Sequence, residues 1–482
     1  MKNVCLVIID GYGISKEEVG NATTRSHYIN KLKESNGYLE IFAHGKYVGL
    51  PDGKMGNSEV GHITIGSGRI ISQSLIMIKN AFETGELKNI ISRLKVSGKK
   101  IHLIGMISDG GVHSHLDHLK YLLECIPMKY SVYIHAIADG IDVSPDTFAD
   151  FIQPFNNIVS ISGRYFAMDR DMNYKRTEQV FQMMVNKENG PGISNNFGGA
   201  GCNAVNTNIN DIIRGIVAKS AGDEFIEPTL LINEPVTSDD TVIFFNFRAD
   251  RMRQLYNRFK EFCRVYTITE YEDGDPNAIL RKPSVENTLS EWLSKYNKTQ
   301  AHIAETEKYA HVTYFFNGGK EFKFDNEDWF VLPSPKVEDF TLAPGTSMKE
   351  VANTCRECIE KKYDFIVINL AAPDLLGHTG NFEKTVEAVS IMDDQIKGIH
   401  EKAVKEDYVM VITADHGNSE QMVLNEKICK SHTTNKVLFM VLNSEKKLSG
   451  RPEASLKDVA PTVLHLMGIP VPGEMTGTSL LE

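Results

Sequence analysis

The sequence predicts an α/β protein in which mainly parallel strands alternate with helices. Short, nearly continuous apolar runs recur along the chain, and segments with helical periodicity separate them. Such runs are typical of strands that are buried on both faces of a parallel sheet. The chain has 482 residues, of which 41% are hydrophobic, so it is long enough to form more than one domain.

The predicted strands each end at polar or charged residues, as expected where a strand meets a loop at the edge of a sheet. Strands are expected at residues 3–9, 101–107, 132–138, 158–162, 242–246, 364–370, 408–413 and 437–442. Helices are expected at residues 22–35, 72–82, 348–361 and 457–467. A further helix is expected to start at residues 302–308 and to run toward Phe316.

Charge and composition exclude several classes of protein. The net charge is −11 and there is no basic run, so no nucleic-acid partner is expected. No apolar run reaches membrane-spanning length, and the N-terminus lacks the pattern of a signal peptide, so we expect a cytoplasmic protein without a membrane partner. The seven cysteines are scattered. One pair, Cys355 and Cys358, has CxxC spacing, but the lack of a second pair argues against a zinc or redox role.

Charged residues follow four predicted strands in the middle of the chain. A single arginine after a strand is usually a surface residue. Several loops that bring arginine to the same sheet edge instead indicate a site for an anionic substrate, since guanidinium groups match carboxylate and phosphate. The residues expected to meet there are His113, Asp142, Arg164, Arg170, Arg248 and Arg251.

Ser58 lies in the stretch MGNSEVGH between small residues and a helix-forming segment. Gly56 and Asn57 allow a tight turn, and backbone N–H groups at the start of a helix favour an anion there. One interpretation is a glycine-rich turn with a serine cap. The other is a nucleophile that accepts a phosphoryl group, which the remaining motifs of the chain favour.

Carboxylate and imidazole side chains also follow strands near both ends of the chain. Such mixtures suit Mn²⁺ or Zn²⁺, and the share of carboxylates favours Mn²⁺ or Mg²⁺ over a thiolate zinc site. Two metal ions can stabilise the oxygens of an in-line phosphoryl displacement. The candidate ligands are Asp10, Asp374, His378, Asp415, His416 and His432.

Taken together, these motifs identify a resemblance to the cofactor-independent (2,3-bisphosphoglycerate-independent) phosphoglycerate mutases, a family of the alkaline phosphatase superfamily. The resemblance runs from Asp10 to the C-terminal region. The motifs that carry it, in the order of the family, are MGNSEVGH, SDGGVHSH, GRYFAMDRD, FRADR, AETEKYAHVTYFFNGG, APDLLGH and TADHGN.

The resemblance implies two α/β domains. A phosphatase-like, metal-binding domain would comprise residues 1–72 and 284–482, and a phosphotransferase domain that binds substrate would be inserted at residues 73–283. It implies two Mn²⁺ ions, with Mg²⁺, Co²⁺ or Zn²⁺ as alternatives. One ion would be held by Asp374, His378 and His432, and the other by Asp10, Ser58, Asp415 and His416.

The implied reaction is the interconversion of 3-phosphoglycerate and 2-phosphoglycerate, in glycolysis and gluconeogenesis, through a phosphoserine on Ser58. Lys308 would neutralise charge on the transferring oxygens, and Asp142 would exchange protons with the glycerate. We expect a monomer whose domains close over the substrate and exclude water. The implied substrate ligands are His113, Asp142, Arg164, Arg170, Arg248, Arg251 and Lys308.

One motif departs from the family pattern. Where the family has Asp-Gly-Arg-Asp, this chain reads Asp139-Gly140-Ile141-Asp142, so one expected arginine is replaced by isoleucine. Two other functions therefore stay open. The first is a metal-dependent phosphatase or another phosphomutase of the same superfamily, which would share Ser58 and the metal ligands but not the arginine loops. The second is a non-catalytic binding protein, against which the complete set of metal ligands argues.

Overall fold

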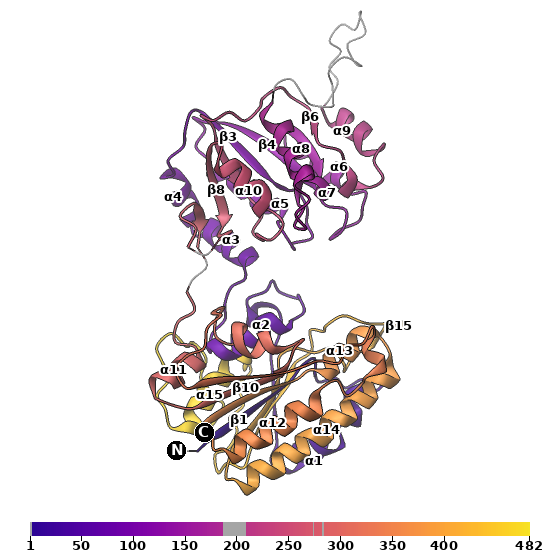
Figure 1. Cartoon of the computed structure of the whole chain (residues 1–482), viewed down its shortest axis with the longest axis vertical. Helices are drawn as coiled ribbons and strands as arrows, with labels where there is room; N and C mark the ends of the chain where they lie inside the picture. The colour runs from indigo at the N-terminus through magenta and orange to yellow at the C-terminus, as the bar shows by residue number, and fades with distance from the viewer. Residues whose placement is uncertain (1, 187–208, 273, 282–283) are drawn as a thin grey trace, which may run out of the picture. The chain divides into compact units, whose positions relative to one another are not determined.

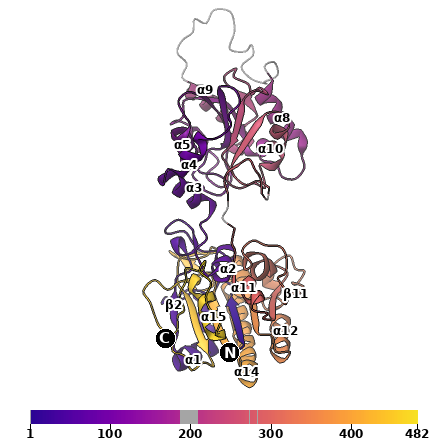
Figure 2. The same ribbon diagram turned by 90° about the vertical axis from the view of Figure 1, so that its left-hand side faces the viewer.

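The computed structural model of the chain describes residues 2–186, 209–272, 274–281 and 284–482. It divides into two compact units. Unit 1 comprises Met1–Gln73 and Ser284–Glu482, and unit 2 comprises Ser74–Pro283. Figures 1 and 2 show a separate sheet, covered by helices, in each unit.

Unit 1 is built on a seven-stranded sheet that is parallel except for the sixth strand in spatial order, which pairs antiparallel with both of its neighbours. Every residue of its central strand β1 is buried, as the apolar run VCLVII predicts. In the order in which they lie side by side, the strands are β11 (Glu327–Leu332), β10 (Gln300–Glu305), β12 (Phe365–Leu370), β1 (Val4–Ile9), β13 (Val409–Ala414), β16 (Val437–Leu442) and β2 (Leu39–Ile41).

Helices cover both faces of this sheet. Figure 1 shows α1, α12 and α14 on one face and α2, α11 and α15 on the other. A small hairpin of β14 (Val423–Leu424) and β15 (Lys427–Ile428) lies outside the sheet. The helices are α1 (His27–Asn36), α2 (Ser58–Ser67), α11 (Leu289–Lys295), α12 (Met348–Glu360), α13 (Ala372–Thr379), α14 (Phe382–Lys405) and α15 (Val459–Met467).

Unit 2 contains a second seven-stranded sheet, parallel except for β6. Alternate residues of its central strand enter different cores, with Leu103 in one and Ile104 in the other, as expected for a sheet covered on both faces. In spatial order the strands are β6 (Thr229–Leu230), β5 (Ile158–Gly163), β4 (Ser131–Ala138), β3 (Lys100–Met106), β7 (Thr241–Phe244), β8 (Arg264–Thr269) and β9 (Ala278–Leu280).

Short helices connect these strands. None of the helices in the described part of the chain combines the length and the apolar character needed to cross a membrane. The helices of unit 2 are α3 (Ser74–Glu83), α4 (Glu86–Ser92), α5 (Leu116–Cys125), α6 (Phe148–Phe151), α7 (Arg164–Ala167), α8 (Tyr174–Val185), α9 (Ile209–Val217) and α10 (Arg253–Lys260).

The predicted α/β class with mainly parallel sheets is confirmed, but one element was predicted wrongly. The segment that begins at His302 was expected to open a helix, and it is instead the buried strand β10. Its alanine and glutamate favour a helix, but pairing with β11 on one side and β12 on the other overrides that local preference. Helical structure begins only at Tyr309, just before the π-helix η4 (His311–Phe315). The helix expected at residues 22–35 is also interrupted, at Ser26.

Candidate active site

The candidate metal ligands of unit 1 gather at the carboxyl edge of its sheet. Asp10 follows β1, Asp374 lies on α13 directly after β12, and Asp415 follows β13. These three strands are neighbours in the sheet and run parallel, so their C-terminal ends meet at one edge. All three carboxylates are buried.

Ser58 is the first residue of α2, and its side chain points into this cluster. The helix cap is Asn57, whose side chain accepts a hydrogen bond from Val60 N at 3.0 Å, so Ser58 is not needed as a cap. Ser58 Oγ lies 3.2 Å from Asp10 Oδ1 and 3.0 Å from His416 Nε2. The serine hydroxyl is therefore held by the groups that surround it, with 7% of the residue exposed.

Lys308 is the cation among these carboxylates. Its Nζ donates to Asp10 Oδ1 at 2.8 Å, to Asp374 Oδ2 at 2.6 Å and to Ser58 Oγ at 3.0 Å. Burial alone would raise the pKa of Asp10, but the charge of Lys308 lowers it well below its usual range. Burial would lower the pKa of Lys308, but the charges of Asp10 and Asp374 raise it. Both groups are thus kept ionised.

Two histidines, His378 and His432, face each other beside Asp374 at the more exposed side of the cluster. His378 Nδ1 donates to Lys430 O at 2.8 Å, and His432 Nδ1 donates to Gly56 O at 2.9 Å. Because a carbonyl can only accept, each ring presents Nε2 to the other, and these atoms are 2.9 Å apart. They also lie 3.4 Å and 3.2 Å from Asp374 Oδ1. Three acceptor atoms that converge in this way fit a shared cation.

A second observation also fits metal ions. Asp415 Oδ2 is buried, accepts no hydrogen bond from the described residues and faces His416 Nε2 at 3.3 Å. Burial would lower the pKa of His416, but the charge of Asp415 raises it to about 9. Among the described residues, Lys308 pairs with two of the three buried carboxylates of the cluster, Asp10 and Asp374, and buried charges need compensation. The residues present therefore fit divalent cations.

Supporting residues that the sequence analysis did not identify complete this cluster. His62 lies one turn after Ser58 on α2, donates to Ser58 O at 2.8 Å and accepts from Asn369 Nδ2 at 3.1 Å. Both of its nitrogens thus have hydrogen-bond partners. One ligand atom each of His62, Asp10 and Asp415 also lie within 4.8 Å of one another, a distance that suits a shared metal ion. Its place in the motif MGNSEVGH was the available signal.

The second predicted cluster lies in unit 2, at the carboxyl edge of its own sheet. The loops after β3, β4, β5 and β7 carry it, and these strands are neighbours. Arg164 Nη1 donates to Asp139 Oδ1 at 2.6 Å and to Asp142 Oδ2 at 2.7 Å. His113 Nε2 lies 3.9 Å from Asp142 Oδ2, and burial and the charge of Arg164 lower the pKa of His113 to about 4. This histidine is neutral near pH 7.

The other arginines of this cluster are more open. Asp250 pairs with Arg170 and with Arg248, each at 3.1 Å, and these two arginine side chains are 47% and 50% exposed. Arg251 contacts Met168 O at 3.4 Å. The cluster thus has cations that can bind an incoming anion and two aspartates, Asp139 and Asp250, that hold the arginines. Sequence reasoning missed both aspartates, although each lies within a motif.

Ile141 is 58% exposed beside this cluster. Its backbone N donates to Asp139 Oδ1 at 3.2 Å, while its side chain lies open to solvent. An isoleucine at this position therefore does not fill a packing site.

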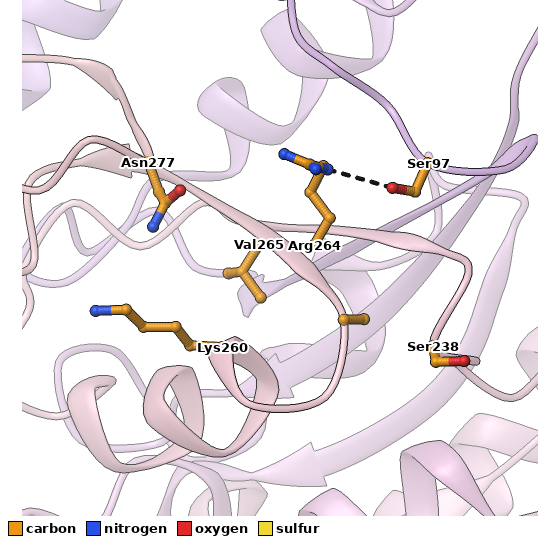
Figure 3. Close-up of a pocket in the computed structure, with 7 residues that line it drawn as sticks. Ser97, Ser238, Lys260, Arg264, Val265 and Asn277 are labelled. Carbon is orange, nitrogen blue, oxygen red and sulfur yellow. Dashed lines mark hydrogen bonds between the residues drawn. The ribbon is translucent and has the colours of Figure 1, made fainter.

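A cysteine pair and a cavity lie outside the two clusters and have no features of a metal or anion site. Cys355 and Cys358 are buried in α12, and burial raises the pKa of Cys358 to about 12. A cavity of about 410 Å³ lies in unit 2, at the end of the sheet where β8 starts, away from the arginine loops (Figure 3). Its cations already have partners, because Lys260 pairs with Glu272 at 3.1 Å and Arg264 Nε donates to Ser97 Oγ at 3.2 Å.

Comparisons with known proteins agree with this geometry. The model of a family described as the metalloenzyme superfamily matches residues 2–471. The 2,3-bisphosphoglycerate-independent phosphoglycerate mutase of Onchocerca volvulus is 40% identical over 98% of this chain and 97% of its own. That of Clostridium kluyveri is 41% identical over 100% of this chain and 99% of its own. The crystal structure of Leishmania mexicana phosphoglycerate mutase at low cobalt concentration has a TM-score of 0.67 at 25% identity and covers 100% of this chain and 98% of its own.

Proposed function

This chain belongs to the family of 2,3-bisphosphoglycerate-independent phosphoglycerate mutases, and we propose that it interconverts 3-phosphoglycerate and 2-phosphoglycerate through a phosphoserine at Ser58. The observation that carries the proposal is the position of Ser58 Oγ, within 3.2 Å of Asp10 Oδ1, His416 Nε2 and Lys308 Nζ. A hydroxyl held between acceptors and a cation, at the start of a helix, suits attack on a phosphate ester.

The chain is metal-dependent, and we propose two Mn²⁺ ions, although Mg²⁺, Co²⁺ and Zn²⁺ also suit the ligands. When bound, such ions supply positive charge that stabilises the transferring phosphoryl oxygens. Asp374, His378 and His432 would hold one ion. The other would be held by Asp10, Ser58, Asp415 and His416.

In the proposed reaction, the chain's own residues carry out phosphoryl transfer in two steps. Ser58 Oγ forms a bond to phosphorus while the bond from phosphorus to the 3-oxygen of glycerate breaks. The serine proton has one acceptor in contact, Asp10 Oδ1. Asp142 gives a proton to the departing alkoxide. It then takes one from the 2-hydroxyl as that oxygen attacks phosphorus, while the bond from phosphorus to Ser58 Oγ breaks and Oγ recovers its proton. Lys308 stays protonated and offsets the charge on the phosphoryl oxygens.

We propose that the arginine cluster of unit 2 binds the phosphoglycerate. Arg170 and Arg248 are exposed enough to form charge-assisted bonds with its carboxylate or phosphate. His113 would contribute as a neutral imidazole, because its pKa is lowered to about 4. In this proposal residues 1–72 and 284–482 form the phosphatase-like domain, and the inserted residues 73–283 form the phosphotransferase domain. The substrate ligands are His113, Asp142, Arg164, Arg170, Arg248, Arg251 and Lys308.

The experiment that tests the function is a mutase assay with added Mn²⁺ and no 2,3-bisphosphoglycerate. Interconversion of the two phosphoglycerates supports the proposal. Free phosphate as the main product would instead favour the alternative, a metal-dependent phosphatase or other phosphomutase, which needs Ser58 and the metal ligands but not the arginine loops.

We further propose that the protein acts as a monomer in the cytoplasm on this small-molecule substrate. Its net charge of −11 argues against a nucleic-acid partner, and we propose no membrane partner. Sedimentation of the purified chain tests the oligomeric state, and a stable dimer would refute it.

A further inference from the structure

Glu420 is a buried carboxylate next to the metal centre, and the proposed mechanism does not use it. Only 1% of the residue is exposed. It lies in the loop that follows β13, five residues after Asp415. A carboxylate buried this completely needs several hydrogen-bond donors to offset the loss of water.

Four donors from three different segments surround Glu420. Oε2 accepts from Gly13 N at 3.0 Å and from Asn418 N at 2.8 Å. Oε1 accepts from Asn435 Nδ2 at 3.0 Å and from the hydroxyl of Thr433. Because two carboxylate oxygens offer about four acceptor positions, these bonds leave Glu420 no free position for a metal ion.

Each of these donors lies within three residues of a proposed metal ligand. Gly13 follows Asp10 in the loop after β1, and Thr433 is the residue directly after His432. Asn418 follows His416 by two positions, and its side chain donates to Asp374 Oδ1 at 2.8 Å. Glu420 thus joins the segments that carry Asp10, His416 and His432, and it reaches Asp374 through Asn418.

Two glycines show how closely these segments pack on the carboxylate. A Cβ atom at Gly13 or at Gly417 would collide with the Glu420 side chain, and at Gly417 it would also collide with Thr433. The segments can therefore approach Glu420 only because these positions lack side chains.

We propose that Glu420 is a positioning residue that holds the ligand-bearing loops in the geometry required for metal binding. This inference rests on the proposed metal centre. Outer partners of metal ligands fix ligand orientation, and their removal typically costs about 10- to 100-fold in metal affinity. Glutamine keeps the shape of glutamate, but its amide NH₂ would oppose two of the donors.

The test compares Glu420→Gln with Glu327→Gln in the metal-stripped full chain. Glu327 is a matched control because it is also buried, with 4% exposed, and it accepts from Asn317 Nδ2, Phe324 N and Trp329 Nε1. It is the first residue of the edge strand β11, so it lies at the sheet edge opposite to the metal ligands. Titration with Mn²⁺, read as free Mn²⁺ by electron paramagnetic resonance, gives Kd, and urea unfolding gives stability.

We expect Glu420→Gln to raise the Kd for Mn²⁺ by about 10- to 100-fold. Glu327→Gln should leave that Kd unchanged, even if both variants unfold at lower urea concentration. An unchanged Kd in Glu420→Gln, or an equal rise in Glu327→Gln, would overturn the inference.

If Glu420→Gln does not fold, a second variant tests the positioning role of Glu420. Thr433→Val removes one donor to Glu420 with little change in volume, and we expect a smaller but measurable rise in Kd. An unchanged Kd for Mn²⁺ in folded Thr433→Val would then refute the role of Glu420. The wild-type titration separates this outcome from a failure of the proposed function, because a wild-type chain that binds no Mn²⁺ refutes the metal centre itself.

Discussion

Ser58 is held at the start of α2 by contacts that do not stabilise the helix itself. The cap is Asn57, so the Ser58 hydroxyl contributes its bonds to Asp10, His416 and Lys308 and not a helix cap. We expect Ser58→Ala to lower mutase activity by several orders of magnitude, as when a covalent nucleophile is removed. Its free energy of unfolding should fall by no more than about 1–3 kcal/mol, the cost of removing one partner from buried hydrogen bonds.

Labelled phosphoglycerate and urea unfolding of both proteins provide the measurements for Ser58→Ala. Phosphate trapped on the wild-type enzyme should be found on Ser58 and should be absent from the variant. Label on a histidine such as His113 would contradict the serine mechanism.

Ile141 occupies the position where the family pattern has arginine, and its side chain is 58% exposed. An arginine could therefore extend from this position without displacing core residues. A charge-assisted hydrogen bond contributes about 1.5–3 kcal/mol, equivalent to about ten- to a hundred-fold in binding. We expect Ile141→Arg to lower KM for phosphoglycerate by about ten-fold.

Steady-state kinetics check this expectation, and Ile141→Met controls for side-chain length without charge. If folded Ile141→Arg kept the wild-type KM, the existing arginines would already satisfy the substrate, and the replacement in this chain would have no effect on binding.

Helix α2 packs closely against the loop that follows β13. A Cβ atom at Gly61 would lie 2.5 Å from Asp415 O and 2.8 Å from Asp415 Cβ. Because this contact would push α2 away from the sheet, Gly61→Ala should lower the free energy of unfolding by about 1–3 kcal/mol. Mutase activity should fall too, since Ser58 would move away from Asp10 and His416.

Gly473→Ala is the matched control for this substitution, because nothing lies within 4 Å of the Cβ position there. Urea unfolding and mutase assays of both variants give the comparison. Equal stability of Gly61→Ala and wild type would show that α2 does not need the close approach.

The elements also show what the sequence could predict. Strands such as β1 and β16 were predictable because they are apolar along their whole length. Strand β10 was not, because its alanine and glutamate favour a helix and only its neighbours in the sheet make it a strand. Among the site residues, charged side chains after strands were recognisable. Asn369 and Glu420 were not, because polar residues that support others have no distinctive spacing.

The residue pattern of the sequence predicted which residues form the functional sites, but it did not predict how the chain is divided into two units. Unit 1 is formed from two segments, Met1–Gln73 and Ser284–Glu482, and strands from both segments pair in one sheet. Nothing in the local pattern of residues specifies that β1 lies between β12 and β13, because such pairing is set by the packing of segments far apart in the chain. The discontinuous arrangement could be expected only from the family resemblance.

This division leads to a prediction about metal removal. The proposed ligands lie entirely in unit 1, whose buried carboxylates Asp10, Asp374 and Asp415 exceed the charge of Lys308. An ion that binds only the folded state stabilises it by about 2.7 kcal/mol at a concentration 100-fold above Kd. We therefore expect chelation to abolish activity, and Mn²⁺ to restore it better than Ca²⁺, whose preference for oxygen ligands suits histidines poorly.

Hydrogen exchange shows where this stabilisation acts. Mn²⁺ should slow amide exchange in the loops after β1, β12 and β13 and at the start of α2, because these segments carry the proposed ligands. Strands β3, β4 and β5 of unit 2 should exchange at the same rate with and without the ion, since the proposed metal ligands all lie in unit 1. Equal protection of both sheets, or full activity after metal analysis shows an empty protein, would contradict a metal centre confined to unit 1.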